Sequence, residues 1–379
     1  MSRLLRIGLC ALVLVCGVYS QADDLDKTLH DALMASRVPA VGVAVLKDGQ
    51  VDRQAVLGRQ RNDRPDKVAL DDKWLIGSTG KVMTVALMAR LVEQQRLDWD
   101  SPLAQMLPEL ANSMRPEYRK VTLAQLLSHR AGLPRDMRDL RVISRYLKDK
   151  RDIRVQRAEF IARALQDAPE GEVGSFAYSN TGFIVAAAIA ERATGQSFEA
   201  LMRDEVFAPL AMQGASFGAP AAGEPMGHQH GKPMRAPRNV DDGLPAIYAP
   251  AGFVRMSLAD WARFNLDQLA GAQGKGRLLS DASYKLMQTA QPGGPAAMDW
   301  GVQPSIMGRK GPVLVHAGSD GNWLAYVILF PESGAGVLAV ANAGEDMGSE
   351  AVLRKVLGPV LVQISPPFKA EPEAKMIGQ

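Results

Sequence analysis

Stretches typical of β-strands lie near both ends of this 379-residue chain, and the long middle has the composition of helices. Val41 to Leu46 is β-rich, and Asp48-Gly49 turns it back into a second run ending near Leu57, which predicts a hairpin. Three more strands are predicted at residues 313–317, 323–330 and 336–341. This order predicts an α+β fold. One antiparallel sheet comes from both chain ends and is flanked by helices, with a helical lobe inserted at roughly 80–250.

Apolar spacing and capping residues predict the helices. The regular spacing of Leu25, Leu29 and Leu33 favours an amphipathic helix over about residues 24–37. Trp261 and Phe264 share one face of a helix that Ser257 caps. Further helices are predicted at 79–95, 122–129, 183–193 and 349–363, and Pro or Gly predicts loops at 97–110 and 214–250.

Residues 1–22 have the pattern of a secretory signal peptide. Arg3 and Arg6 precede an apolar run from Ile7 to Val18, and Ser20-Gln21-Ala22 supplies the small residues of a cleavage site. The run is too short to span a bilayer comfortably, so we expect no stable membrane insertion after cleavage. An uncleaved anchor is the alternative. Lipid attachment is disfavoured because Val15 precedes the cysteine at position 16.

The mature protein is therefore expected to be one domain, residues 23–365, followed by a flexible tail at 366–379. Both cysteines, Cys10 and Cys16, lie in the leader, so no disulfide is expected. Export without disulfides suits a bacterial periplasm, although secretion to the medium is equally compatible. The formal charge of +3 falls to +1 without the leader's two arginines, which gives no reason to expect a nucleic-acid partner. Nothing in the sequence indicates the oligomeric state.

Residues 130–157 contain ten Lys or Arg against four Asp or Glu. We interpret this basic segment as a solvated helical face, with contact to an anionic surface as the alternative. His228 and His230 have the spacing of a metal-binding pair, but no third ligand is evident nearby. We therefore expect neither a metal site nor another cofactor.

Ser78 is the only serine with a lysine, Lys81, three residues further on. At a helix start this spacing places both side chains on one face, and the free N–H groups there favour a negative transition state. A lysine in a partly dry pocket can lose its proton near neutral pH and act as a base. The alternative is a simple helix cap, since Ser-x-x-Lys arises by chance about once in a chain of this size.

Tyr178-Ser179-Asn180 precedes a predicted buried helix and offers a phenol to relay a proton and an amide to hold a substrate carbonyl. A capped turn with Tyr178 in the core is the alternative. His316-Ala317-Gly318-Ser319 ends a predicted strand, where small residues admit a substrate backbone and an edge N–H could complete an oxyanion hole. The alternative there is a strand end with a hydrogen-bonded histidine.

In this order and spacing the three motifs resemble those of serine β-lactamase-like hydrolases and penicillin-binding proteins. The likeness is greatest to the branch of class C β-lactamases, esterases and D-aminopeptidases, over about residues 25–360. Three further segments support it: 74–78, 126–134, which is similar to "LLTHTSGLP", and 249–253, which is similar to "PAGGL".

The resemblance implies a role for each motif residue. Ser78 becomes the acylated nucleophile, Lys81 its base partner and Tyr178 the second acid/base. Substrate-binding roles fall to Asn180, His316, Gly318 and Ser319, with the Ser78 and Ser319 amides forming the oxyanion hole.

Two departures separate the chain from the β-lactamases it resembles. His316 stands where the family motif Lys-Thr-Gly has a permanent cation, and we expect this imidazole to be mostly neutral at pH 7. Ala317 lacks the hydroxyl that helps hold a substrate carboxylate. Esterase-like family members often carry such a His-x-Gly variant. We therefore predict an exported serine hydrolase of small esters, amides or peptides, more esterase or peptidase than β-lactamase. The alternative is a non-catalytic module that binds cell-wall fragments or β-lactams.

Overall fold

The computed structural model describes residues 24–234, 245–292 and 294–364. The predicted signal peptide and tail lie outside these residues. Among the described helices, none has both the length and the apolar composition needed to cross a membrane.

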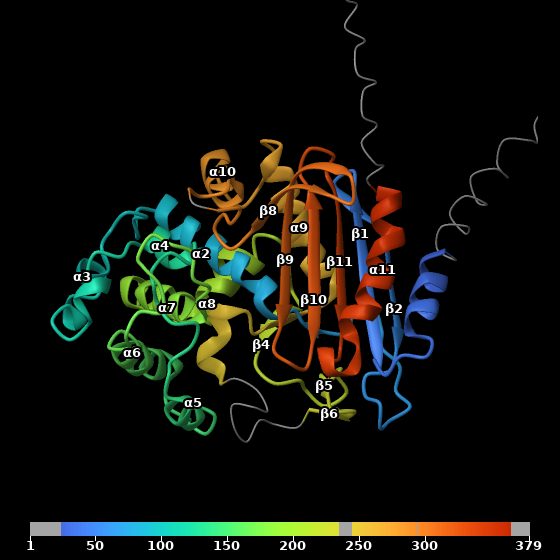
Figure 1. Ribbon diagram of the computed structural model, residues 1–379, viewed down its shortest axis with the longest axis horizontal. Helices are drawn as coiled ribbons and strands as arrows, with labels where there is room; N and C mark the ends of the chain where they lie inside the picture. Colours follow the sequence, from blue (N-terminus) through green and yellow to red (C-terminus); the bar gives the residue numbers. More distant parts are fainter. Residues whose placement is uncertain (1–23, 235–244, 293, 365–379) are drawn as a thin grey trace, which may run out of the picture.

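A six-stranded antiparallel sheet forms the body of the molecule, in the order β2-β1-β11-β10-β9-β8 (Figure 1). Strand β1 from the N-terminal end pairs with β11 from the C-terminal end, with Val41 opposite Ala341. The predicted strands and their antiparallel arrangement are confirmed. Their bounds are Ala40–Lys47 (β1), Gln50–Gly58 (β2), Gly301–Ile306 (β8), Arg309–Ser319 (β9), Leu324–Phe330 (β10) and Ala335–Ala341 (β11).

Helices cover both faces of this sheet, so β1 and β11 are buried on each side. Helix α11 (Ser349–Ile364) and the N-terminal helix at residues 24–33 pack with Val41, Val43 and alternate residues of β11. Helix α9 (Leu258–Ala272) packs on the opposite face. Ser257 caps this helix, as predicted, and Trp261 and Phe264 are both buried.

The helical lobe lies between β2 and β8 in the chain and beside β9 in space (Figure 1). The helix predicted at 122–129 is present as α4, which Thr122 caps in a capping box with Gln125. Residues 97–110 contain a one-turn helix where a loop was expected. The helices are α2 (Lys81–Glu93), α3 (Leu103–Met106), α4 (Leu123–Leu127), α5 (Leu140–Tyr146), α6 (Ile153–Ala164), α7 (Asn180–Thr194), α8 (Phe198–Met202) and α10 (Asp281–Gln288). Short strands lie at Trp74–Leu75 (β3), Ser216–Phe217 (β4), His228–Gln229 (β5), Lys232–Pro233 (β6) and Val254–Met256 (β7).

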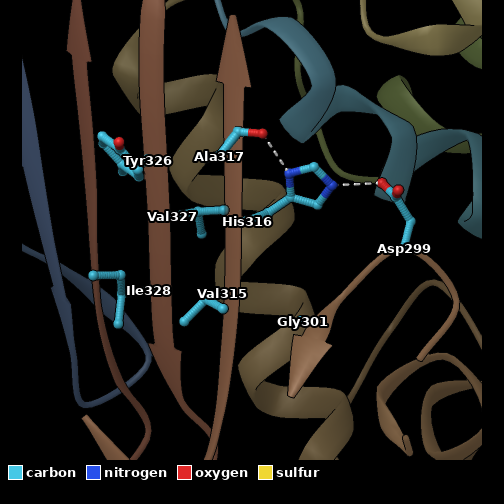
Figure 2. A pocket seen from close by; sticks show the side chains of 8 residues that line it. All are labelled: Asp299, Gly301, Val315, His316, Ala317, Tyr326, Val327 and Ile328. Carbon is cyan, nitrogen blue, oxygen red and sulfur yellow. Dashed lines mark hydrogen bonds and ion pairs between the residues drawn. The ribbon is translucent and has the colours of Figure 1, made fainter. Parts of the chain in front are cut away.

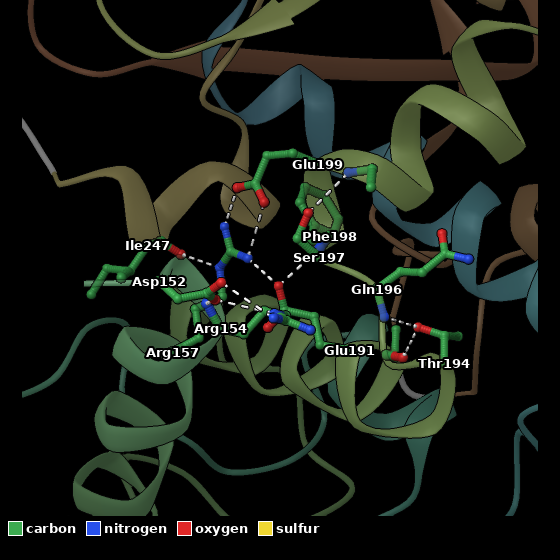
Figure 3. Close-up of polar contacts among 12 residues, drawn as sticks. Asp152, Arg154, Arg157, Glu191, Thr194, Gln196, Ser197, Phe198, Glu199 and Ile247 are labelled. Carbon is green, nitrogen blue, oxygen red and sulfur yellow. Dashed lines mark hydrogen bonds and ion pairs between the residues drawn. The ribbon is translucent and has the colours of Figure 1, made fainter. Parts of the chain in front are cut away.

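The basic segment is only partly a solvated face. Arg141, Arg151 and Arg154 are exposed and pair with aspartates two residues away. Arg157 is instead fully buried, where it forms ion pairs with Glu191 of α7 and Glu199 of α8 (Figure 3). These two ion pairs connect α6 to α7 and α8.

Candidate active site

Ser78 lies in a 3₁₀ turn, Gly77–Gly80, that runs directly into α2. Neither the turn nor the helix has a side-chain capping hydrogen bond at its start, so Ser78 is not a helix cap. Its Oγ instead accepts hydrogen bonds from Lys81 Nζ and from Tyr178 OH, each at 2.9 Å. The fold therefore brings together the three residues that were predicted to carry the chemistry.

Lys81 is completely buried, although it is an amine. Its Nζ also donates to the carbonyl oxygen of Ala251 at 2.6 Å, which fixes it beneath the nucleophile. Burial lowers the pKa of Lys81 to about 8, while the carboxylates of Asp299 and Asp136 act in the opposite direction. About a tenth of the amine is then neutral at pH 7 and able to accept a proton.

Tyr178 approaches the nucleophile from the segment just before α7. Burial raises the pKa of its hydroxyl, so the side chain is a neutral phenol that donates to Ser78. Lys81 Nζ lies 5.0 Å and Arg135 Cζ 5.1 Å from the ring centroid. The Arg135 charge favours negative charge on the phenol oxygen, whereas the Asp299 carboxylate opposes it.

Strand β9 packs its backbone directly against the nucleophile turn. A Cβ on Gly318 would lie 2.7 Å from the Ser78 amide nitrogen, and one on Gly77 would lie 2.6 Å from the Ser319 amide nitrogen. Gly77 also has a φ of +54°, a conformation that suits glycine. Glycine at both positions thus permits the close approach of the Ser78 and Ser319 amides, the groups predicted to form an oxyanion hole.

His316 lies on β9 with both ring nitrogens occupied, as Figure 2 shows. Nε2 is 2.8 Å from Asp299 Oδ2, and Nδ1 is 2.8 Å from the carbonyl oxygen of Ala317. The other oxygen of Asp299, Oδ1, lies 2.8 Å from His129 Nε2. The sequence reasoning assigned no role to Asp299 or His129. Position 129 lies in one of the segments of family resemblance, whereas nothing marked position 299.

Asn180 is the first residue of α7, and its Nδ2 donates to Asp136 Oδ1 at 2.9 Å. Its predicted contact with substrate stays a prediction, as does that of Ser319, whose Oγ accepts from the Gly321 amide at 3.0 Å. His228 and His230, the pair considered for a metal, have ring contacts with Asn342 and Asp346. Both ring nitrogens of His228 have protein partners, and the described residues contain no cluster of three potential ligands.

The family model named Beta-lactamase matches residues 25–359. This protein belongs to the β-lactamase family. Among curated relatives of this β-lactamase-family protein, penicillin-binding protein 4 of Amycolatopsis lactamdurans is 30% identical, with 83% of this chain and 84% of the relative covered. Protein flp of Staphylococcus aureus (strain MW2) is 22% identical over 85% of this chain, which spans only 63% of that longer protein.

Solved structures confirm the β-lactamase/transpeptidase-like fold. SurE, described in complex with D-Leu, superposes with a TM-score of 0.73 at 20% identity, covering 93% of this chain and 78% of that one. A class C β-lactamase from Rhodobacter sphaeroides gives 0.69 at 18% identity, covering 90% and 99%. At these identities the likeness shows the fold alone. Family membership supports serine hydrolase activity in the broad sense.

Proposed function

We propose that this protein hydrolyses small esters or amides through an acyl-enzyme on Ser78. The observation that carries the proposal is the pair of 2.9 Å hydrogen bonds on Ser78 Oγ, one from a buried amine and one from a buried phenol. Neutral Lys81 takes the hydroxyl proton as Oγ bonds to the substrate carbonyl carbon. The resulting oxyanion lies at the Ser78 and Ser319 amides.

The collapse of this intermediate needs a proton on the leaving group. Tyr178 donates it and recovers one from Lys81, so that the serine proton has moved by relay to the departing alcohol or amine. Water then attacks the acyl carbon, and its proton passes through the same two side chains to Ser78 Oγ. The bond between the acyl carbon and Oγ breaks, which releases the acid and restores Ser78.

Esters or simple amides are proposed over β-lactams because of the two residues on β9. A β-lactam carries a carboxylate beside the scissile bond, and a cation plus a hydroxyl bind such a group best. The ring nitrogens of His316 are both engaged within the protein, and Ala317 offers only a methyl. Peptides form the second substrate class, because their scissile bond is an amide that the same serine chemistry can cleave.

Export to the periplasm or medium is part of the proposal and rests on the leader pattern of residues 1–22. A non-catalytic binding module is the competing function. It would acylate once or not at all, whereas a hydrolase would turn over many equivalents of a p-nitrophenyl ester.

A fluorophosphonate probe with intact-mass readout tests the nucleophile. We expect one adduct on the wild type and none on Ser78→Ala, with Ser101→Ala as the matched control that still labels. Equal labelling of Ser78→Ala and the wild type would contradict the mechanism.

Substrate class is tested by kcat/KM for a p-nitrophenyl ester and a chromogenic cephalosporin. We expect measurable ester hydrolysis and poor cephalosporin turnover, because one missing charge-assisted hydrogen bond costs about 1.5–3 kcal/mol, or roughly ten- to a hundredfold in rate. The double change His316→Lys with Ala317→Thr should shift the ratio toward the cephalosporin. Efficient cephalosporin hydrolysis by the wild type would refute this choice of substrate.

A further inference from the structure

Asp299 is a buried carboxylate held between two histidines from different parts of the fold. Its side chain is 1% exposed, and those of His129 and His316 are 2% and 8% exposed. His129 follows α4 in the helical lobe, and His316 belongs to β9 of the sheet. Each imidazole presents Nε2 to its own oxygen of Asp299 at 2.8 Å, so the carboxylate bridges lobe and sheet.

The hydrogen-bond partners determine the proton count of each ring. Ionised carboxylates and carbonyls only accept hydrogen bonds. His316 faces Asp299 with one nitrogen and the Ala317 carbonyl with the other, so hydrogen bonds to both acceptors require a proton on each nitrogen, as in an imidazolium. His129 instead accepts the Ser179 amide on Nδ1 at 3.0 Å, so it is neutral with its proton on Nε2.

Burial and the two histidines act in opposite directions on the central carboxylate. Burial opposes the charge on Asp299, but His316 and His129 together lower the pKa of Asp299 to about 2. Burial lowers the pKa of His129 more than the bound Asp299 carboxylate raises it, and the nearby Lys81 and His316 add to the lowering. Tyr178, whose ring packs on His129, is a further titratable neighbour, and its phenol is neutral.

The backbone shows that the cluster is held in place. His129 has a φ of 59° and Asp299 a φ of 66°, in the left-handed region that non-glycine residues seldom adopt. Such residues concentrate at functional sites, where the surrounding structure maintains them. Both members of one hydrogen-bonded pair therefore have backbones that the fold must stabilise.

Both ends of the cluster touch the proposed catalytic apparatus. The His129 ring lies 4.4 Å from the Tyr178 ring, centroid to centroid, with 31° between the planes. It also holds the amide of Ser179, the residue after Tyr178. At the other end, His316 lies two residues before Gly318, whose backbone packs against Ser78.

We infer that Asp299 is a positioning residue that keeps His316 an imidazolium and His129 the Nε2-protonated tautomer, and thereby fixes Tyr178 and β9 relative to Ser78. The charge of His316 is thus neutralised inside the protein rather than offered to a substrate carboxylate. The effect on catalysis rests on the proposed function, whereas the protonation states are properties of the resting protein.

Nitrogen-15 NMR of histidine-labelled, substrate-free protein tests the protonation states, with the His316 signals assigned by their loss in His316→Gln. At pH 7 we expect two protonated, pyrrole-type nitrogens for His316 and one of each type for His129. In Asp299→Asn the amide oxygen can serve His129 while the amide NH₂ faces His316, whose Nε2 must then lose its proton to accept. One His316 nitrogen should therefore become pyridine-type. A pyridine-type nitrogen on His316 in the wild type at pH 7 would overturn the inference.

Kinetics of the same variant test the positioning role. Asp299→Asn should lower kcat for a p-nitrophenyl ester by about tenfold or more while KM stays within about twofold, the pattern of a lost transition-state interaction. Asp267→Asn is the matched control, because that buried carboxylate serves Tyr284 and the Arg277 amide outside the site, and its kcat should match the wild type. An unchanged kcat in Asp299→Asn would refute the positioning role. If the wild type hydrolyses no ester, the proposed function fails while the NMR result still decides the inference.

Discussion

Lys81 illustrates, at the scale of single residues, how position alone changes the chemistry of a side chain. An exposed lysine is almost wholly charged at neutral pH, but Lys81 is completely buried at the start of α2. Desolvation penalises its charged form, and the partial compensation by Asp299 and Asp136 leaves the pKa at about 8. The amine can thus bind Ser78 in either protonation state.

The pH dependence of ester hydrolysis should report this titration. If neutral Lys81 accepts the serine proton, kcat/KM should rise about tenfold per pH unit below 8 and level off above it, because the neutral fraction grows as the proton is lost. Initial rates between pH 5.5 and 9.5, corrected for spontaneous hydrolysis, provide the measurement. Lys81→Arg, which stays charged throughout, should abolish the rise together with most of the activity. A flat wild-type profile would remove Lys81 from the role of base.

The residues found from the sequence were those with a local signature. Ser78 and Lys81 lie three apart on one turn, and Tyr178 is marked by the asparagine two residues on, so the motifs sufficed. Asp299 could not be found in this way, because its partners lie 170 and 17 residues away and only the folded sheet brings them together. The expectation that His316 is mostly neutral stays a prediction, because it was made from the residue type alone. The contacts of His316 with Asp299 and with the Ala317 carbonyl, from which we infer an imidazolium, exist only in the folded sheet.

At the scale of helices and strands, predictability followed the strength of local signals. The β1–β2 hairpin and α4 have their own turn and capping residues, and both form as expected. Strand β8 was missed because it contains Gly301 and Pro304 and is only partly buried. It is an edge strand, defined by pairing with β9, where Gly301 faces Val315. Such strands owe their conformation to the partner more than to their own propensity.

Helix α6 is attached to the rest of the lobe by the buried arginine described above. Arg157→Met should lower the free energy of unfolding by about 3–5 kcal/mol, because Glu191 would remain buried without its partner. Burial already raises the pKa of Glu191, and loss of the guanidinium should raise it further. Urea denaturation followed by circular dichroism measures the change.

Arg163→Met is the matched control on the same helix. Arg163 is 48% exposed and pairs with Glu159 one turn earlier, so this change should cost less than about 1 kcal/mol. A cost for Arg157→Met as small as that of the control would show that the buried network adds little to the stability of the lobe.

In the whole molecule, strands from the two ends of the chain pair with each other inside one sheet. Strand β11 lies between β1 and β10, and every one of its residues is buried. The helical lobe, which contributes Ser78, Lys81 and Tyr178, lies between β2 and β8 in the sequence. The β9 side of the site therefore depends on a sheet that cannot form until the last strands are present, since their contacts span about 300 residues, as in the pairing of Val41 with Ala341.

A chain that ends at residue 331 tests this dependence. It keeps Ser78, Lys81, Tyr178, Asp299 and His316 but lacks β11 and α11. The β1–β2 hairpin then has no strand that pairs it with β8–β10, and both hydrophobic clusters lose residues. The free energy lost with this apolar burial exceeds the roughly 5–15 kcal/mol by which folded domains are stable. We therefore expect the shorter chain to show neither cooperative urea unfolding nor ester hydrolysis. A chain that ends at Ile364 retains every described element and should match the full-length protein in both measurements. Cooperative unfolding together with ester turnover by the shorter chain would show that the helical lobe and strands β8–β10 fold without β11 and α11. The closure of the sheet by both chain ends would then be unnecessary for the site.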